Sequence, residues 1–379
     1  MIPFNIPYVP EASRAYVEEV LSSEHQQGDG QYTEKASSAI SKLVGGGKVL
    51  LTPSCTHALE MASMLANLGP DDEVILPAYT FTSAATAITK FGATPVFVDI
   101  DPKTKCIETE QVISAITSKT KAISWVNYAG VAPDLTRLKQ IAKDYNLILI
   151  EDNAHGLGGS FEGKPLGSFG DFATQSFHAT KNLQCGEGGA LVVNNPDYYE
   201  RAEVIREKGT NRRKFLAGEV MKYHWVDKGS SYLLAEALSG VLLGQLENFS
   251  LIQEHRLRIW NEYNDHFNRY ELANNFEIQQ QSDHSKNIAH MFHLTFKNKN
   301  LREEYRTRLL ERGIQATSHY EPLNSSPAGI KFGKSNRETP HASEFSERIL
   351  RLPLHLKLES SNVSYIFECI KAIDSKYEN

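Results

Sequence analysis

Short apolar runs alternate with amphipathic stretches over about residues 48–195 of the chain. This alternation is typical of βαβ units, in which a mostly parallel sheet is packed between helices. We therefore predict an α/β fold with one strand at each apolar run, namely residues 48–51, 73–76, 95–98, 122–126, 147–150 and 189–193.

Two of the intervening stretches, residues 58–68 and 135–145, have apolar residues at helical spacing. Asp134 is a suitable N-cap for the second of these predicted helices. After the last predicted strand, a helical stretch leads into residues 206–214, which are basic and turn-prone. We predict that this basic segment forms a long loop.

Helical spacing returns over residues 231–270, and we predict a domain boundary inside this long helix, near residue 250. Beyond it the pattern predicts a strand at 289–296, a helix at 301–312 and a second strand at 314–319. The chain is thus expected to divide into a large α/β domain, residues 1–250, and a small C-terminal α+β domain, residues 251–379.

Composition narrows the class of protein. The formal net charge of −6 argues against a general nucleic-acid binder. The first residues lack the pattern of a signal peptide, and no uncharged apolar run reaches membrane-spanning length, so we expect a soluble cytoplasmic enzyme without a membrane partner. The four cysteines form no CxxC pair and no cluster with metal-ligand spacing. We expect free thiols and no metal site.

The carboxyl ends of the predicted strands are the places where ligands gather in open parallel sheets. Residues 52–56 lead from the first strand into a helix beginning near His57, so their hydroxyl and N–H groups suit a phosphate, or they only cap the helix. Phe81 follows the next strand and suits either stacking on a flat heteroaromatic group or packing in the core.

Asp152 and Lys181 are a candidate pair for an aldehyde cofactor. Asp152 closely follows an apolar run, and a buried carboxylate there calls for a cationic partner such as a protonated pyridine ring. The amine of Lys181 suits capture of the aldehyde as an imine, and Ser176 in the same segment is a candidate phosphate contact. Taken singly, Asp152 is better explained as a helix cap at the end of a strand, and Lys181 as a solvated loop lysine. A phosphate P-loop is excluded, because GxxxxGK[ST] occurs nowhere in the chain.

These residues, in this order, resemble the sugar aminotransferases of the DegT/DnrJ/EryC1/StrS family, which are fold-type I pyridoxal 5'-phosphate enzymes. The resemblance extends over essentially the whole chain and is greatest to the branch that aminates dTDP-4-dehydro-6-deoxyglucose with L-glutamate. The segments that carry it are residues 50–56 (LLTPSCT), 128–132 (YAGVA), 205–212 (IREKGTNR), 229–232 (GSSY) and 351–354 (RLPL).

The resemblance implies an aspartate aminotransferase-like fold and a set of cofactor contacts. Lys181 becomes the Schiff-base lysine, Asp152 the partner of the ring nitrogen, and Phe81 the residue that stacks on the ring. Cys55, Thr56 and Ser176 are expected to bind the phosphate of the cofactor. His155 occupies a position usually filled by a cofactor-binding glutamine, and a histidine there adds a titratable group.

The same resemblance implies a homodimer with shared active sites. The loop around Ser231 reaches into the partner subunit's site in the family, where many members have asparagine in place of Ser231 and arginine in place of Leu233. His319 and Tyr320 belong to a segment at the active site that commonly ends in histidine, whereas this chain has Asn324. We expect His319 and Tyr320 to contact the substrate.

Charge alone suggests where a nucleotide diphosphate binds. Arg206, Lys208, Arg212 and Arg213 lie close together, and among them we single out Lys208 and Arg212 as substrate contacts. A solvated basic loop is the alternative for each residue of this segment.

The expected reaction is a two-half transamination for cell-surface glycan synthesis, giving 2-oxoglutarate and dTDP-4-amino-4,6-dideoxygalactose, with freed Lys181 moving the proton. Related enzymes make the glucose epimer or a 3-amino sugar, and these alternatives remain open. Sugar dehydratases with this fold have a histidine in place of the lysine, so Lys181 favours transamination. A non-enzymatic cofactor binder or regulator is a further alternative.

Overall fold

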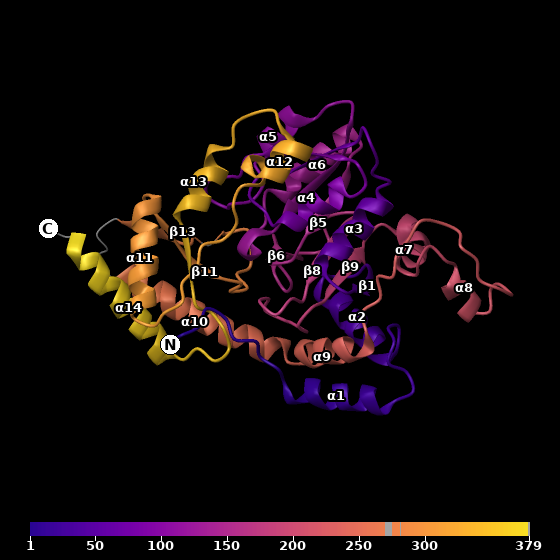
Figure 1. Cartoon of the computed structure of the whole chain (residues 1–379), viewed down its shortest axis with the longest axis horizontal. Coiled ribbons are helices and arrows are strands. Elements are labelled where there is room, and N and C mark those ends of the chain that lie inside the picture. Colours follow the sequence, from indigo (N-terminus) through magenta and orange to yellow (C-terminus); the bar gives the residue numbers. More distant parts are fainter. Residues whose placement is uncertain (270–274, 281, 378–379) are drawn as a thin grey trace.

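The computed structural model describes residues 1–269, 275–280 and 282–377. Its centre is an eight-stranded sheet (Figure 1). The strands follow in the order β1 (Lys48–Thr52), β9 (Gly189–Val193), β8 (Phe172–Ser176), β5 (Ile148–Asp152), β4 (Thr120–Val126), β2 (Glu73–Pro77), β3 (Thr94–Val98) and β12 (Lys334–Ser335). Only β9 runs against its neighbours, which confirms the predicted mostly parallel sheet.

Every predicted apolar run in this part of the chain forms a strand of the sheet. β8 was not among the predicted runs, because its sequence FATQS is largely polar. Thr174 and Gln175 are nevertheless fully buried, since β5 and β9 flank β8 on its two sides. The sheet interior thus accepts polar side chains near its carboxyl edge.

Helices cover both faces of the sheet because alternate side chains of each strand point to opposite layers. Leu76 packs in one layer and Ile75 in the other. The first layer contains α3 (Cys55–Leu65), α4 (Thr82–Thr89) and α7 (Tyr199–Arg206). The opposite layer contains α5 (Thr109–Ala115) and α6 (Leu135–Tyr145). In the same layer, α2 (Gln31–Leu43) and α9 (Glu236–Glu247) lie beside β1 and β9. α1 (Glu11–Ser22) lies along α9.

Two of these helices begin at capping residues. Asp134 accepts the backbone N–H of Arg137 at 2.9 Å, which confirms it as the N-cap of α6. α3 begins at Cys55, two residues before the predicted start near His57, and Ser54 caps it by accepting the N–H of His57 at 3.2 Å.

The helical stretch predicted at residues 231–270 is two helices instead of one. Asn248 separates α9 from α10 (Phe249–Arg269), and residues 231–235 are not helical. Residue 270 lies outside the described residues. The predicted domain boundary between residues 250 and 251 falls within the first turn of α10 and stays a prediction.

The C-terminal part of the chain forms a second sheet with its own core. Its strands are β10 (Phe276–Ile278), β11 (Phe292–Phe296) and β13 (Ile349–Leu352), packed against α10, α11 (Lys299–Glu311) and α14 (Ser360–Asp374). The predicted strand at 314–319 is wrong. Ile314 and Thr317 form only isolated bridges, to Ile2 and Arg351, and β13 pairs along β11 instead.

Short elements complete the described chain: β6 (Ser160–Phe161), β7 (Lys164–Pro165), α12 (Pro327–Phe332), α13 (Pro340–Arg348) and the 3-10 helices η1 (Tyr128–Gly130), η2 (Pro196–Tyr198), η3 (Leu323–Ser325) and η4 (Ser375–Tyr377). Among the described residues, no helix is both long and apolar enough to cross a membrane.

The basic segment predicted as a loop is partly helical. α7 ends at Arg206, and α8 (Arg212–Leu216) follows after a short turn. In Figure 1, α8 projects from the body of the molecule on the side opposite the C-terminal helices. This arm, defined here as residues 207–231, exposes the large apolar side chains of Leu216, Met221 and Trp225.

Candidate active site

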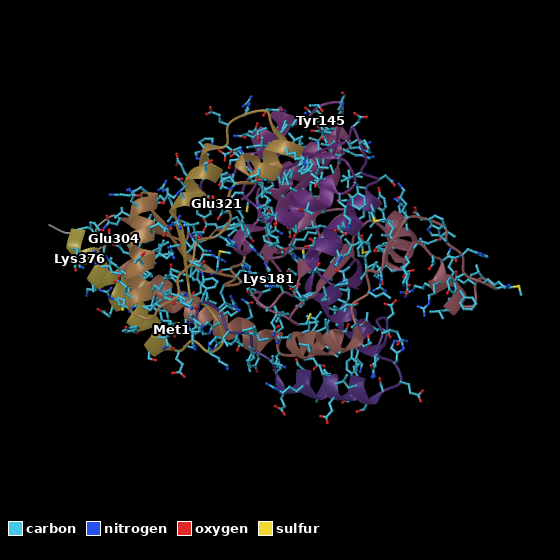
Figure 2. The ribbon with its side chains drawn as sticks, viewed as in Figure 1. Met1, Tyr145, Lys181, Glu304, Glu321 and Lys376 are labelled. Carbon is cyan, nitrogen blue, oxygen red and sulfur yellow. The ribbon has the colours of Figure 1, made fainter. Side chains whose placement is uncertain are left out.

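A cavity of about 510 Å³ lies at the carboxyl edge of the large sheet, where the C-terminal elements meet it. Figure 2 labels Lys181 near the middle of the view. The cavity brings together most of the predicted site residues, namely Cys55, Thr56, Phe81, Asp152, His155, Ser176, Lys181, His319 and Tyr320. Ser231, Lys208 and Arg212 do not line it.

Lys181 lies in the loop that follows β8, where its backbone N–H donates to the carbonyl of His178 at 2.9 Å. Its side chain is partly exposed to the cavity. The surrounding protein removes water from the ammonium and lowers the pKa of Lys181 to about 8, although the charge of Asp152 opposes this shift. The amine is therefore neutral, and nucleophilic, in a larger fraction of molecules near neutral pH than an ordinary lysine, although the charged form still predominates.

Asp152 is the last residue of β5, and its carboxylate accepts the N–H of Ala154 at 3.1 Å. Burial raises the pKa of Asp152, while the Ala154 N–H and the charge of Lys181 lower it. Within the described residues, no cation lies within 4 Å of this carboxylate. A buried carboxylate in this state gains a great deal from a cationic group in the cavity, and a protonated ring nitrogen fits that need.

The start of α3 forms an anion-binding corner of the cavity. Its first backbone N–H groups have no partners within the helix, and the helix dipole favours negative charge there. Cys55 and Thr56 open this helix, and Thr56 Oγ1 lies 2.7 Å from Ser83 Oγ. A Cβ on Gly189 would lie 2.4 Å from the Cys55 nitrogen, so glycine there lets β9 pass close to the corner. Ser176 lines the same cavity, and the donor set fits a phosphate.

Phe81 precedes α4 and is 53% exposed, so much of its ring is uncovered at the cavity. Its centroid lies 5.7 Å from that of Tyr320. The neighbouring Thr80 has a buried hydroxyl with no hydrogen-bond partner among the described residues, and it also lines the cavity. An exposed ring beside an unpaired hydroxyl fits a planar ligand with polar substituents. Together with Lys181, Asp152 and the α3 corner, these residues fit pyridoxal phosphate.

His155 is held as a neutral imidazole. Its Nδ1 accepts the N–H of Ala129 at 3.3 Å, so its Nε2 carries the proton and donates to the Tyr320 hydroxyl at 3.2 Å. Its ring stacks on that of His290 with centroids 4.2 Å apart. Burial lowers the pKa of His155 well below its usual value of 6.5. The expected titratable group therefore stays uncharged around neutral pH.

His319 continues this cluster of rings. Its Nδ1 lies 2.7 Å from the Tyr128 hydroxyl, and its ring stacks on Tyr320 at 3.6 Å. Removal from water lowers the pKa of His319 and of His290 well below 6.5. Sequence reasoning assigned no role to His290 or Arg351, although both line the cavity. Arg351 belongs to the segment 351–354 named above, but His290 lies within the predicted strand 289–296 and gave no local signal.

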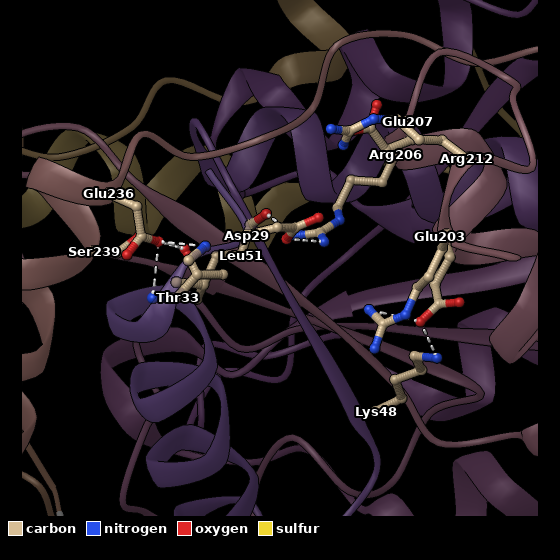
Figure 3. A network of polar contacts seen from close by, with 12 residues as sticks. Asp29, Thr33, Lys48, Leu51, Glu203, Arg206, Glu207, Arg212, Glu236 and Ser239 are labelled. Atoms are coloured by element: carbon tan, nitrogen blue, oxygen red, sulfur yellow. Dashed lines mark hydrogen bonds and ion pairs between the residues drawn. The ribbon is translucent and has the colours of Figure 1, made fainter. Parts of the chain in front are cut away.

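The remaining predicted contacts lie on or beside the arm. Lys208 and Arg212 both pair with Glu207, at 2.8 and 3.0 Å. Ser231 is exposed, and its backbone forms an isolated bridge with that of Glu207. Arg206 was expected in the exposed loop but is buried, where it pairs with Asp29 and donates to the Leu51 carbonyl at 3.3 Å (Figure 3).

Comparisons with known proteins agree with this geometry. The family model described as the DegT/DnrJ/EryC1/StrS aminotransferase family matches residues 7–371. The chain is 29% identical to GDP-perosamine synthase of Escherichia coli O157:H7, over 97% of each chain. It is 31% identical to a pleiotropic regulatory protein of Geobacillus stearothermophilus, over 95% of this chain and 94% of that one.

A solved structure extends the likeness to three dimensions. The putative sugar aminotransferase Spr1654 of Streptococcus pneumoniae, in its PMP-form, superimposes with a TM-score of 0.91 at 28% identity, over 100% of both chains. The PLP-form of the same protein gives a TM-score of 0.90. The chain therefore belongs to the DegT/DnrJ/EryC1/StrS aminotransferase family and is a pyridoxal phosphate-dependent sugar aminotransferase.

Proposed function

We propose that this enzyme transfers the amino group of L-glutamate to C4 of dTDP-4-dehydro-6-deoxyglucose, giving 2-oxoglutarate and dTDP-4-amino-4,6-dideoxygalactose. The observation that carries the proposal is the gathering of Lys181, Asp152 and the α3 corner around one cavity, together with residues of the segments 50–56 and 351–354 that characterise this branch. The product would serve the synthesis of a surface polysaccharide such as an O-antigen.

Each cavity residue has a distinct task in this proposal. Lys181 holds the cofactor and, once released, moves a proton between the donor α-carbon and the cofactor. Asp152 keeps the ring nitrogen protonated, Phe81 stacks on the ring, and Cys55, Thr56 and Ser176 bind the phosphate. His155 donates one hydrogen bond from Nε2 near the ring oxygen. Bound pyridoxal phosphate supplies the carbonyl that carries the amino group and the ring that stabilises negative charge.

The pKa of Lys181 suits its proposed task. An acid–base group works best when its pKa lies near the working pH, and this amine has a pKa of about 8. The ring cluster of His155, His290 and His319 is neutral around pH 7, so it does not compete with Lys181 for the proton. His319 and Tyr320 are then free to offer uncharged hydrogen bonds to the hydroxyl groups of the sugar.

We propose further that the active unit is a homodimer in which the arm reaches the partner's cavity. The arm projects from the body, exposes Leu216, Met221 and Trp225, and contains Lys208, Arg212 and Ser231 outside its own cavity. Exposed apolar side chains of this size suit a protein interface. Sedimentation tests the dimer, and restored activity on mixing Lys181→Arg subunits with arm-variant subunits tests the shared site.

The reaction itself is tested by incubating the enzyme with glutamate and dTDP-4-dehydro-6-deoxyglucose and determining the C4 configuration of the product by NMR. The galacto configuration supports the proposal. The gluco configuration or amination at C3 replaces it with a related activity. A GDP-linked 4-dehydro sugar serves as the competing substrate, because the similarity to GDP-perosamine synthase favours a GDP-sugar as the second candidate.

A regulatory role is separated from catalysis by the cofactor absorbance. This test is included because the chain is similar to a pleiotropic regulatory protein. If glutamate changes the absorbance and 2-oxoglutarate is released, the protein is a catalyst. If the cofactor binds but no amino acid changes its absorbance, the non-enzymatic alternative holds.

A further inference from the structure

We propose that His290 is a specificity-determining residue whose Nε2 accepts a hydrogen bond from the sugar hydroxyl next to the reacting carbonyl, the C3 hydroxyl of dTDP-4-dehydro-6-deoxyglucose. The inference rests on the proposed use of a 4-dehydro sugar and deepens it. It begins from a histidine that lines the cavity and to which no role in binding has yet been given.

The tautomer of His290 is set by a chain of hydrogen bonds that begins at a backbone carbonyl. The carbonyl of Ile288 can only accept, so the amide nitrogen of Asn182, which lies 2.9 Å away, donates to it. The amide oxygen of Asn182 then lies 3.0 Å from Nδ1 of His290, and this oxygen can only accept as well. Nδ1 therefore carries the proton of the neutral imidazole, and Nε2 carries a lone pair.

The lone pair on Nε2 is available around pH 7, because the imidazole is uncharged there. Removal from water and the charge of Lys181 hold the pKa of His290 well below its usual value of 6.5. The ring of His155, on which His290 stacks, has the opposite tautomer, because its Nδ1 accepts the N–H of Ala129. Of these two stacked imidazoles, only His290 has a free acceptor nitrogen.

Contacts on several sides hold the ring of His290 in place. One face stacks on His155 with centroids 4.2 Å apart, and Nδ1 is bonded to Asn182. The backbone carbonyl of His290 accepts Nη2 of Arg256 at 2.8 Å, and the preceding Ala289 has a left-handed φ of 47°, which is uncommon for a residue with a Cβ. Among the described residues, Nε2 has no hydrogen-bond partner, so a ligand or solvent in the cavity supplies its donor.

The chemistry of the groups that enter the cavity narrows the choice of ligand. The cofactor phosphate, the carboxylates of the amino donor and the carbonyl of the sugar present acceptor oxygens, which do not bond to the lone pair on Nε2. The amine of the amino donor is itself the reacting group, so it is not available for a lasting hydrogen bond. The hydroxyl groups of the sugar are donors that do not react. An acceptor on His290 therefore suits the sugar.

The position of His290 beside Lys181 selects one hydroxyl of the sugar. His290 is bonded to Asn182, which follows Lys181 in the chain, and the charge of Lys181 acts on its pKa. The amine of Lys181 serves the reaction at C4. On one side of C4 is C3, which bears a hydroxyl, and on the other is C5, which bears the ring oxygen and the methyl group. The C3 hydroxyl is therefore the donor nearest to the reacting centre.

A cycle that alters both the protein and the sugar tests this contact. The probes are dTDP-6-deoxygalactose, which has a hydroxyl at C4 and does not react, and its 3-deoxy analogue. Calorimetry on the cofactor-loaded protein measures Kd for each, so the readout does not depend on turnover. The wild type should bind the 3-deoxy analogue about 10-fold more weakly, because Nε2 is left unpaired. His290→Phe, which keeps a ring to stack on His155, should bind both sugars equally weakly.

Two further variants and a spectroscopic measurement support the cycle. His290→Gln should recover part of the discrimination, because its amide nitrogen can donate to Asn182 while its oxygen accepts. His266→Phe is the matched control, since His266 stacks on Phe367 outside the cavity, and its affinities should equal those of the wild type. NMR of the imidazole nitrogens, with His290→Gln used to assign the signals, should place the ring proton of His290 on Nδ1.

Three results would overturn the inference. If His290→Phe discriminates against the 3-deoxy sugar as strongly as the wild type does, His290 does not bind the C3 hydroxyl. If the ring proton is on Nε2, His290 is not an acceptor. If conversion of the cofactor by L-glutamate falls as much as sugar binding does, the role of His290 is structural or is exerted on Lys181.

Failure of the proposed function is distinct from these results. The wild type would then bind another nucleotide sugar in place of the dTDP sugars, and the same cycle applies with the hydroxyl next to the reacting carbonyl of that sugar removed. The NMR measurement on His290 is independent of the identity of the sugar. If the wild type binds no nucleotide sugar, both proposals fail.

Discussion

Asp152 and Lys181 line one cavity, yet no ion pair within 4 Å joins the carboxylate to the amine. Each group is perturbed by its removal from water: the pKa of Asp152 is raised and that of Lys181 is lowered to about 8. The space between their charges suits a ring that bears a cationic nitrogen at one end and a reactive carbonyl near the other. This relationship underlies the first two predictions.

Lys181→Arg is expected to fold and to have no transaminase activity. Arginine keeps the positive charge beside Asp152, but its guanidinium neither reacts with a carbonyl nor moves a proton near neutral pH. Activity is measured as 2-oxoglutarate release, and folding by circular dichroism. Lys139→Arg, on the exposed side of α6, is the control and should be fully active. Near-normal turnover of Lys181→Arg would remove Lys181 from the chemistry.

Lys181→Met is expected to stabilise the cofactor-free protein at pH 7 by roughly 1–2 kcal/mol. The amine has a pKa of about 8 in the folded chain and about 10.5 in the unfolded chain. Between these values the unfolded chain binds more protons, so the stability of the wild type rises with pH there. Some exposure to the cavity reduces the effect below the full shift.

Urea unfolding of both proteins at pH 7 and pH 10 measures this difference. The gap between Lys181→Met and the wild type should be constant below about pH 8 and should close as the pH rises towards 10.5. A gap that does not change with pH would mean that the amine is not perturbed in the folded protein.

His155→Gln is expected to keep activity within about threefold of the wild type, with the same pH profile between pH 6 and 8. Glutamine retains a donor and an acceptor, so it can replace one of the bonds that His155 makes to Ala129 and Tyr320. Because burial keeps His155 neutral, no ionisation is lost in this range. His155→Ala removes both bonds and should be clearly slower. A step near pH 6.5 that is present only in the wild type would show that His155 titrates.

The sequence predicted the strands of the large sheet well where both faces of a strand are apolar. It missed β8, because Thr174 and Gln175 are buried by flanking strands that lie elsewhere in the sequence. It also placed a strand at 314–319, although the partner strand β11 pairs with β13 instead. Pairing is decided between distant segments, and a local pattern does not contain that information.

The candidate site was predictable to the extent that its residues follow strands. Cys55, Phe81 and Asp152 do so, and all three line the cavity. His290 and Arg351 reach it from the C-terminal part of the chain, and no strand-end rule of the large sheet applies to them. Arg206 was misjudged for a related reason, because charge along the sequence does not show that Asp29 and the Leu51 carbonyl enclose it.

Arg206→Gln is expected to destabilise the protein by roughly 1–3 kcal/mol, because it removes the buried hydrogen bond to the Leu51 carbonyl and the ion pair with Asp29, whose side chain is 32% exposed. Figure 3 shows this pair together with Glu207 and Arg212 of the arm and with the pair of Lys48 and Glu203. Arg213→Gln, whose side chain is 62% exposed and pairs with Glu203, should change stability by less than about 0.5 kcal/mol. Urea midpoints measure both. Equal, small effects would mean that Arg206 is not a structural residue.

Lys208→Gln and Arg212→Gln are expected to raise the KM for the nucleotide sugar by about 3- to 10-fold each and to leave the KM for glutamate unchanged. Both cations share the single carboxylate of Glu207, so one positive charge is left for a diphosphate. They do not line the cavity of their own chain, so the effect requires the partner subunit. Arg213→Gln is the matched control on the same arm. If the KM values are unchanged in both variants, the arm is only a solvated basic surface and does not bind the diphosphate. If the KM for glutamate rises as well, the arm shapes the whole cavity.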